Sequence, residues 1–193
     1  MRRLISAISI AGLAAAPTLA ETYKGYEMPP YSVIESHDGL EIREYGPHTV
    51  AEVVYEGTVS GTVRQGFRSL ASYIFGGNDA EAKIAMTVPV SQVPARDGVW
   101  KIRFMMPAAE ARAGLPRANS QKIAFETLEG GREAVVVFSG YATDRALQRA
   151  EMQLRTKLAE LGRQPLGPAR YYYYDDPFTV PWNRRNEVAV PVK

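Results

Sequence analysis

The sequence predicts an α+β protein built from two duplicated strand-helix-strand-strand units. Strand and helix patterns recur in the same order in both halves of the chain, and the segment 51–55 resembles 134–138 at an offset of 83 residues. At the same offset Ser60 meets Thr143, and each of these residues precedes a helical pattern. Pairing two such units would bury the apolar face of each and leave a cleft where they meet.

The first twenty residues have the pattern of a secretory signal peptide. Arg2 and Arg3 form a basic start, the uncharged apolar run 4–16 follows, and small residues lead up to Ala20. Because the run is too short to span a bilayer, we expect cleavage near Ala20 and a periplasmic or secreted protein. An N-terminal anchor or a buried helix is the alternative. Residues 21–30 then form a lead-in segment, and residues 31–193 form the folded domain.

The bulk composition is that of one soluble globular domain. The 193 residues are 46% hydrophobic and 23% charged, as in ordinary domains of this size. Removing Arg2 and Arg3 would lower the formal net charge from +2 to zero, which argues against nucleic acid as a partner. The chain has no cysteine, so c-type haem attachment, zinc-thiolate sites and thiol nucleophiles are excluded.

The first half of the domain predicts five strands and one helix. Asp38-Gly39 marks a hairpin between two short alternating runs. Ser60 is expected to cap a helix whose apolar residues recur at helical spacing up to Ile74, and Gly76 ends it. The strands are expected at residues 31–36, 40–45, 49–55, 84–90 and 100–106.

The second half repeats this order after a proline- and alanine-rich connection at 107–120. The turn at Gly130-Gly131 separates two strands, Thr143 is expected to cap the second helix, and Gly162 closes that helix. The strands are expected at residues 121–128, 133–138, 170–174 and 187–192.

The residues that could carry catalysis do not form a recognisable set. The sequence contains neither a G-x-S-x-G motif nor a phosphate-binding loop, and Asp175-Asp176 is a poor metal or acid-base pair because adjacent strand residues point to different sides. We therefore predict a protein that is not an enzyme.

The only histidines are His37 and His48. His48 opens a strand and is the candidate axial ligand for haem iron, although a solvated turn histidine is the plainer alternative.

The aromatic residues near the C-terminus point to a ligand. Four consecutive tyrosines, 171–174, precede Phe178, Val180 and Trp182. Strand alternation would expose two of the four tyrosines, and exposed aromatic residues beside an apolar loop favour a binding site. Met86 could line the same space. Ordinary core packing explains the tyrosines and Met86 equally well.

Four strings make the sequence similar to a known family. They are Glu-Ile-Arg-Glu-Tyr at 41–45, Tyr-Ile-Phe-Gly-Gly-Asn at 73–78, Lys-Ile-Ala-Met-Thr-Val-Pro-Val at 83–90 and Asn-Arg-Arg-Asn-Glu-Val at 183–188. In this order they resemble the SOUL haem-binding protein family over residues 31–192. The resemblance implies a distorted, barrel-like antiparallel sheet with two main helices. It also implies that haem or another tetrapyrrole binds non-covalently in an apolar cleft.

The resemblance places this cleft against the first helix and the late loop, which contributes residues 174–182. A porphyrin is a flat apolar disc with two carboxylates at one edge, so it needs apolar walls and a cation at the rim. Arg64 could meet a carboxylate. Ala71 and Ser72 stand where relatives can have methionine or lysine, which removes one potential partner. The candidate ligand-binding residues are Arg64, Phe67, Ala71, Ile74, Met86, Tyr174, Phe178, Val180 and Trp182.

The sequence therefore predicts an exported protein that holds haem or another tetrapyrrole for buffering or transport. A binding module for a different flat amphipathic molecule is the first alternative. An enzyme that alters the bound tetrapyrrole is the second, and it lacks an assembled set of catalytic residues. No segment after the signal peptide is expected to span a membrane.

Overall fold

The computed structural model describes residues 22–193, so the predicted signal peptide lies outside the described part of the chain. Within it, three helices and one 3₁₀ turn accompany eleven strands. The elements are β1 (Thr22–Tyr23), β2 (Tyr26–Glu27), β3 (Tyr31–His37), β4 (Leu40–Tyr45), β5 (His48–Glu56), α1 (Val59–Ile74), β6 (Val90–Arg96), β7 (Val99–Met105), α2 (Ala108–Ala113), β8 (Ala124–Leu128), β9 (Gly131–Phe138), α3 (Asp144–Glu160), β10 (Arg170–Tyr173), η1 (Pro181–Asn183) and β11 (Asn186–Pro191).

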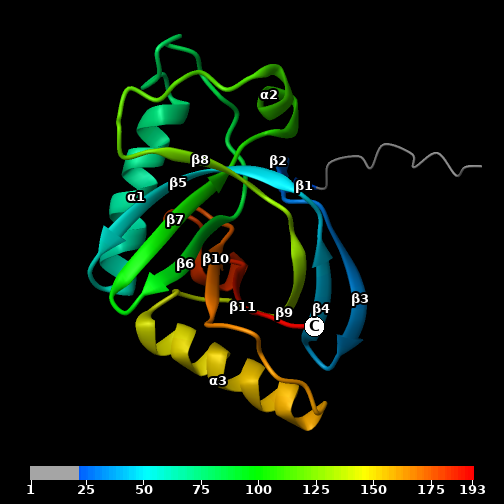
Figure 1. The fold of residues 1–193 in the computed structure, drawn as a ribbon. Helices are drawn as coiled ribbons and strands as arrows, with labels where there is room; N and C mark the ends of the chain where they lie inside the picture. Colours follow the sequence, from blue (N-terminus) through cyan, green and yellow to red (C-terminus); the bar gives the residue numbers. More distant parts are fainter. Residues whose placement is uncertain (1–21) are drawn as a thin grey trace, which may run out of the picture.

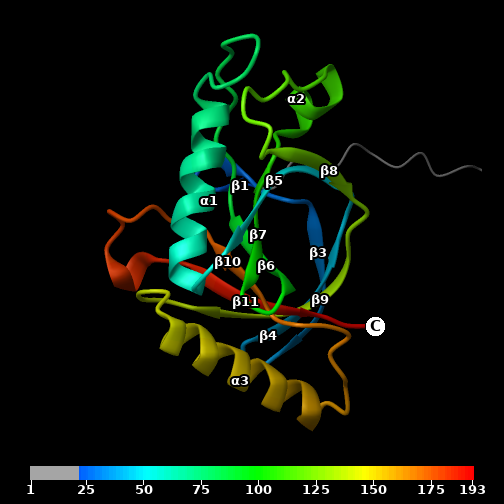
Figure 2. The same ribbon diagram turned by 60° about the vertical axis from the view of Figure 1, so that its left-hand side comes forward.

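Nine of the strands form one curled antiparallel sheet, which confirms the α+β fold with two main helices. The strand order is β3-β4-β9-β11-β10-β6-β7-β5-β8, and the curl makes a half-barrel (Figure 1). Helix α1 packs against β5 and β7, and α3 packs against β9 and β11. Both helices lie on the outer face of the curl (Figures 1 and 2).

The two halves of the sheet have the same internal order. The strands beside α1 run β5-β7-β6, the strands beside α3 run β9-β11-β10, and β6 meets β10 at the centre. Each half also lends a strand to the other, because β4 pairs with β9 and β8 pairs with β5. This order agrees with two strand-helix-strand-strand units, while duplication of the sequence itself stays a prediction.

Side chains on β5 alternate between the helix and the inside of the half-barrel. Ala51 and Val53 are buried in the core under α1, whereas His48 and Val50 line a cavity on the inner face. This alternation follows from the two-residue period of a strand. Helix α1 sits so close to β7 that a side chain at Gly66 would clash with Ile102.

One of the two predicted helix N-caps is observed, and the other is not. Thr143 caps α3 as predicted, because its hydroxyl accepts the backbone N–H of Ala146 at 3.2 Å. The prediction that Ser60 caps the first helix is wrong: Thr58 is the cap, and its hydroxyl accepts the N–H of Gly61 at 3.2 Å. Both residues have a suitable hydroxyl, and the helical backbone begins one residue after Thr58.

The strand expected at 84–90 is also wrong, because the observed strand begins at Val90. Ile84 and Val88 are buried, so the alternation that suggested a strand reflects core packing. Thr87 donates its hydroxyl hydrogen bond to the carbonyl of Met105 at 2.6 Å, which fixes the segment without a continuous strand ladder.

Two segments for which the sequence predicts no helix or strand contain short ones. The lead-in forms the β1–β2 hairpin, in which Tyr23 and Lys24 both contact Asp175, at 3.2 and 2.5 Å. The connection after Pro107 contains α2. The lead-in is therefore attached to the start of the late loop and is not a loose segment.

Candidate functional site

The outer surface of α1 carries part of the predicted site. Phe67 is 40% exposed and makes an edge-on contact with Phe104, with ring centroids 5.4 Å apart. Arg64 is exposed, and its Nε donates to the carbonyl of Ser60 at 3.1 Å, which leaves other guanidinium N–H groups toward solvent. Ala71 is half-buried. Ile74 is only 1% exposed and belongs to the core, so it supports this surface from below and does not form its wall.

The late loop, residues 175–185, presents the remaining apolar groups. A carboxylate oxygen of Asp176 accepts the N–H groups of Phe178 and Thr179 at 2.7 and 3.0 Å. Arg184 donates to the carbonyls of Thr179 and Pro177 at 2.7 and 2.6 Å. These bonds fold the loop back on itself and hold its apolar side chains outward. Phe178 is 94% exposed, Trp182 is 74% exposed, and Val180 is also exposed.

The loop and the first turns of α1 belong to the same region of the molecule. The N–H of Gly140 donates to the carbonyl of Pro181 at 2.9 Å, and Val59 and Phe138 pack against one core cluster. Figures 1 and 2 both show the loop at the level of the N-terminal half of α1. We call the exposed side chains of Arg64, Phe67, Phe178, Val180 and Trp182 the helix–loop surface.

Sequence reasoning missed two exposed aromatic residues, one beside the late loop and one at the C-terminal end of α1. Tyr141 follows β9 and is exposed, with the Arg184 guanidinium 4.9 Å from its ring centroid. Phe75 is exposed at the C-terminal end of α1. A turn tyrosine and a residue after the last apolar position of a helix have no periodic signal, so only the structure reveals them.

His48 lies on the other face of the sheet, inside the half-barrel. Its Nδ1 is 2.9 Å from the carbonyl oxygen of Gly46, so the neutral ring donates from Nδ1 and keeps a lone pair on Nε2. Burial lowers the pKa of His48, and nearby Arg103 lowers it further, while the Gly46 carbonyl and Glu133 act in the opposite direction. A neutral imidazole with a fixed Nδ1 is suited to accept a proton or a metal at Nε2.

Tyr174 and Met86 do not join the helix–loop surface either. Tyr174 is buried, donates to a carboxylate oxygen of Glu187 at 3.1 Å, and lines the same inner cavity as His48. Met86 packs against the core beneath α1. The sequence-predicted set thus divides among an outer surface, an inner cavity and the core.

The tyrosine run is more buried than strand alternation predicted. Tyr171 and Tyr174 are buried, and Tyr172 and Tyr173 are partly buried. Each hydroxyl donates to a side chain, and the four acceptors are Glu151, Glu133, Gln92 and Glu187. The exposure of two tyrosines that strand alternation alone suggested is not observed, and the alternative of packed tyrosines holds, because one face of β10 packs against the core and the other lies inside the half-barrel.

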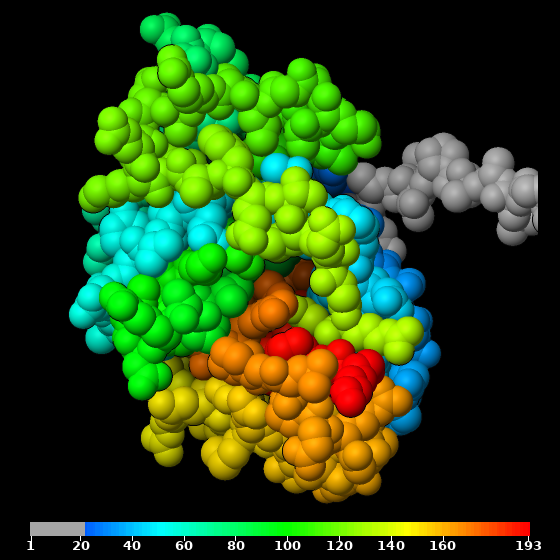
Figure 3. All heavy atoms as spheres, in the orientation of Figure 1, coloured from blue at the N-terminus to red at the C-terminus, as the bar shows by residue number. Residues whose placement is uncertain are grey.

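The inner cavity is a hollow of about 490 Å³ at the centre of the half-barrel. Figure 3 shows it near the middle of the molecule, bordered by the connection between β8 and β9 in yellow-green and by β10 in orange. Its size lies within the range of small-molecule pockets. The residues that line its floor and walls include Pro29, Tyr45, His48, Val50, Pro89, Ser91, Val93, Arg103, Met105, Glu133, Arg170, Tyr172 and Tyr174.

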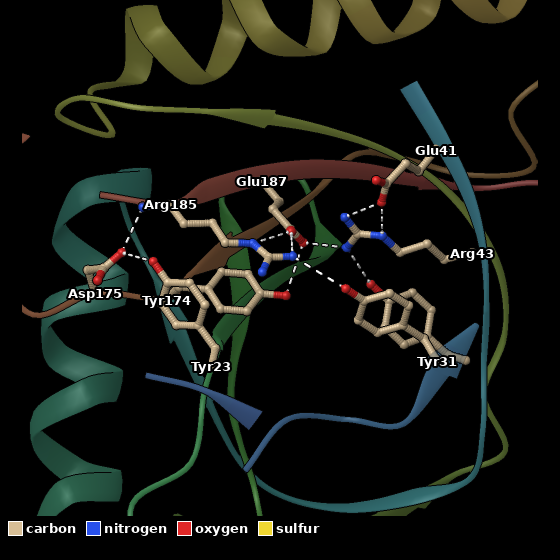
Figure 4. A network of polar contacts seen from close by, with 9 residues as sticks. Tyr23, Tyr31, Glu41, Arg43, Tyr174, Asp175, Arg185 and Glu187 are labelled. Atoms are coloured by element: carbon tan, nitrogen blue, oxygen red, sulfur yellow. Dashed lines mark hydrogen bonds and ion pairs between the residues drawn. The ribbon is translucent and has the colours of Figure 1, made fainter. Parts of the chain in front are cut away.

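A buried ionic network contacts two of the tyrosines that line this cavity, Tyr45 and Tyr174. Glu187 accepts from Arg43 at 2.9 Å and from Arg185 at 2.8 and 2.6 Å, and the two guanidinium groups approach it from opposite sides (Figure 4). Burial alone would lower the pKa of Arg43, but the charge of Glu187, the nearby Tyr45 and the hydrogen bonds to both together raise it. The network joins β4, β11 and the late loop.

Two further findings concern metal ions and membranes. No group of three or more histidine or acidic side chains within residues 22–193 is arranged to hold a metal ion. No helix in that range is long and apolar enough to cross a membrane.

Solved structures define the class of fold. The C-terminal domain of EcmrR superposes with a TM-score of 0.60 at 12% identity, over 84% of this chain and 98% of that domain. A hydrolase from Listeria innocua superposes with a TM-score of 0.52 at 14% identity, over 80% of this chain and 91% of that one. At such identities the likeness shows the fold alone, an α+β half-barrel domain.

The sequence comparisons then identify the family. Residues 26–191 match the SOUL heme-binding protein family. Heme-binding protein 1 of Mus musculus is 30% identical over 151 residues, which cover 75% of this chain and 78% of the mouse protein. Heme-binding protein 2 of Homo sapiens is 30% identical over 158 residues, which cover 77% and 75% of the two chains. The chain belongs to the SOUL heme-binding protein family.

Proposed function

We propose that this protein binds haem or another tetrapyrrole non-covalently on the helix–loop surface. Membership of the SOUL family supports the ligand, because the relatives are named as heme-binding proteins. The observation that carries the site is the outward display of Phe178 and Trp182 by a loop that its own hydrogen bonds hold in place. Large exposed apolar side chains gathered in one region mark an interaction site.

The chemistry of the surface matches an amphipathic disc. Phe67 and Trp182 offer flat apolar groups, and burying apolar area contributes about 25 cal/mol per Å² before association costs are subtracted. Arg64 is exposed on the same helix and can pair with a propionate at the edge of the disc. Apolar contact should therefore dominate affinity, and Arg64 should orient the ligand.

The proposal assigns no catalytic step to the protein. Among the described residues the helix–loop surface contains no histidine, since His37 bonds Glu35 at the end of β3 and His48 faces the inner cavity. Its side chains are apolar apart from Arg64, so the surface supplies neither a general base nor a nucleophile.

We further propose that the protein is exported and buffers or carries its ligand outside the cytoplasm. The basic, apolar and small-residue pattern of residues 1–20 supports export. Expression of the full chain in a bacterium should yield a periplasmic form that begins at Glu21. A full-length product that stays in the cytoplasm would contradict export without affecting the binding proposal.

A haemin titration of residues 21–193 tests the binding function. We expect the Soret band to shift and to saturate at one haemin per chain at micromolar protein. The same titration with protoporphyrin IX, which lacks iron, should also saturate, because the proposed surface offers no ligand to the metal. Absence of a saturable shift in both titrations would exclude tetrapyrrole binding.

A different flat amphipathic ligand is the alternative. The absence of a histidine from the described helix–loop surface favours it, since nothing there requires iron. Displacement of an apolar dye bound to the protein distinguishes a tetrapyrrole site from a site for another flat amphipathic ligand. Displacement by haemin supports the tetrapyrrole proposal, whereas displacement by other polycyclic compounds with haemin inert supports the alternative.

A further inference from the structure

The inner cavity lies over a small side chain at the centre of a strongly curved sheet. On β6, Ser91 lies between Tyr172 of β10 and Arg103 of β7, to which it is paired directly across the strands. A serine between two long side chains leaves space above the sheet. The cavity of about 490 Å³ lies there, on the face opposite α1.

Glu52 and Glu133 on the inner face of the sheet have both carboxylate oxygens occupied, whereas Glu126 and Glu129 line the cavity at exposed positions. Glu52 binds Lys101 with one oxygen at 2.9 Å and Arg103 with the other at 2.6 Å. Glu133 binds Arg170 with one oxygen and accepts the hydroxyl of Tyr172 with the other at 2.8 Å. Neither carboxylate therefore presents an unused oxygen to a guest.

The arginines on the same floor retain hydrogen-bond capacity. A guanidinium has five N–H donors. Among the contacts of the described residues, Arg103 uses Nε and one terminal nitrogen, and Arg170 uses a single terminal nitrogen. Apart from the exposed Glu126 and Glu129, the polar capacity left among the charged lining residues consists of N–H donors, which favours a guest with acceptor oxygens, above all a carboxylate.

The cavity walls favour an aromatic guest. Tyr172 and Tyr174 present rings, and Val50, Val93 and Met105 present aliphatic groups. Ring faces and edges pack well against another planar ring. His48 adds a neutral imidazole at the cavity wall, with Nδ1 held by the carbonyl of Gly46, so Nε2 can accept from a ring hydroxyl.

We propose that the half-barrel cavity is a second ligand site, separate from the helix–loop surface, and that it binds a small aromatic carboxylate. The floor arginines bind the carboxylate, and the tyrosines and aliphatic side chains enclose the ring. This site does not depend on tetrapyrrole binding, because the two surfaces lie on opposite faces of the sheet.

The test is calorimetric titration of residues 21–193 with 2-naphthoate, with 2-naphthalenemethanol and 2-naphthylmethylammonium as uncharged and cationic controls. We expect 1:1 binding of the carboxylate and at least tenfold weaker binding of both controls. Equal affinity for the alcohol or the ammonium compound would overturn the assignment of a carboxylate, and no heat with any of the three would overturn the site.

Two substitutions locate the binding. Ser91→Phe should fill the cavity and weaken 2-naphthoate binding more than tenfold, while Ser32→Phe, the same change at an exposed position of edge strand β3, should leave it unchanged. Arg103→Lys keeps a positive charge beside Glu52 but loses the planar guanidinium, so we expect a several-fold loss of affinity for 2-naphthoate.

If Ser91→Phe does not fold, the affinity of Arg103→Lys tests the site, together with amide NMR shifts that 2-naphthoate causes on β6, β7 and β10 of the unaltered protein. Unchanged affinity in Arg103→Lys, or shifts confined to α1, would contradict the proposal.

Titration of haemin in the presence of saturating 2-naphthoate tests the separation of the sites. We expect the same haemin affinity with and without the carboxylate. Mutual displacement would show one shared site and overturn the second-site proposal. A protein that binds 2-naphthoate but no haemin would instead contradict only the proposed function.

Discussion

His48 and Phe67 lie on opposite faces of the same sheet. Phe67 contacts Phe104 on the side of β7 that α1 covers. His48 lines the inner cavity with Arg103 and Met105, the neighbours of Phe104 along β7. Because successive residues of a strand point to opposite faces, a haem that rests on Phe67 cannot be ligated by His48.

Trp182 should contribute strongly to tetrapyrrole affinity. It is 74% exposed in the unliganded protein, so covering it with a ligand would bury new apolar area. We expect Trp182→Ala to weaken haemin binding about fivefold to thirtyfold, or about 1–2 kcal/mol. Met152→Ala, which truncates an exposed apolar residue of α3, should leave the haemin titration unchanged, and equal losses in both variants would argue against the helix–loop surface.

Arg64 should recognise the carboxylate edge of the ligand. Since Arg64 is exposed, the contact is screened by solvent and worth only about 0.5–1 kcal/mol. We therefore expect haemin to bind a few-fold more tightly than its dimethyl ester, and Arg64→Gln to remove this preference. Arg149→Gln on α3 is the matched control, and it should preserve the preference. Persistence of the preference in Arg64→Gln would assign the carboxylate to another residue.

The lowered pKa of His48 predicts a dependence of stability on pH. The unfolded imidazole ionises near pH 6.5, whereas burial lowers the pKa in the folded protein. Below about pH 6.5 the unfolded state binds more protons, so His48 reduces the free energy of unfolding as the pH falls toward its folded pKa and has no such effect above 6.5. Urea denaturation at pH 7.5 and 5.5 should show a larger loss for the unaltered protein than for His48→Asn. Equal losses would contradict burial of a neutral ring.

Glu187 should matter far more to stability than a surface glutamate with the same geometry. Glu187 and Arg43 are 2.9 Å apart and essentially fully buried, whereas Glu44 and Arg132 are also 2.9 Å apart but 47% exposed. Removing one partner of a buried pair leaves an uncompensated charge, so Glu187→Gln should lower the free energy of unfolding by about 3–5 kcal/mol. Glu44→Gln should cost about 0–1 kcal/mol. Denaturant midpoints that shift equally would show that burial is not the deciding factor.

Much of the fold could be predicted from local sequence because its signals are periodic. The hairpin at Asp38-Gly39 and the Thr143 cap of α3 appear where the pattern indicated. The strand predicted at 84–90 is not observed there, because buried residues can alternate along an irregular segment as well as along a strand. Thr58 was overlooked because a second hydroxyl residue, Ser60, stands two positions later.

The site was harder to predict because periodicity says which residues are buried and not which surface they face. Tyr174 and Phe178 are close in sequence, yet one lines the inner cavity and the other is displayed on the outer loop. The turn between them is set by the bonds of Asp176 and Arg184. The cavity itself depends on the curvature of nine strands, which no single segment encodes.

The most direct test compares Phe67→Ala with His48→Ala in haemin titrations that record affinity and the spectra of both iron oxidation states. If tetrapyrrole binds on the helix–loop surface, Phe67→Ala weakens binding, while His48→Ala leaves the affinity and the spectra as they were. If His48→Ala alone abolishes binding and alters the spectra, the iron is ligated inside the half-barrel and the helix–loop surface is not the haem site.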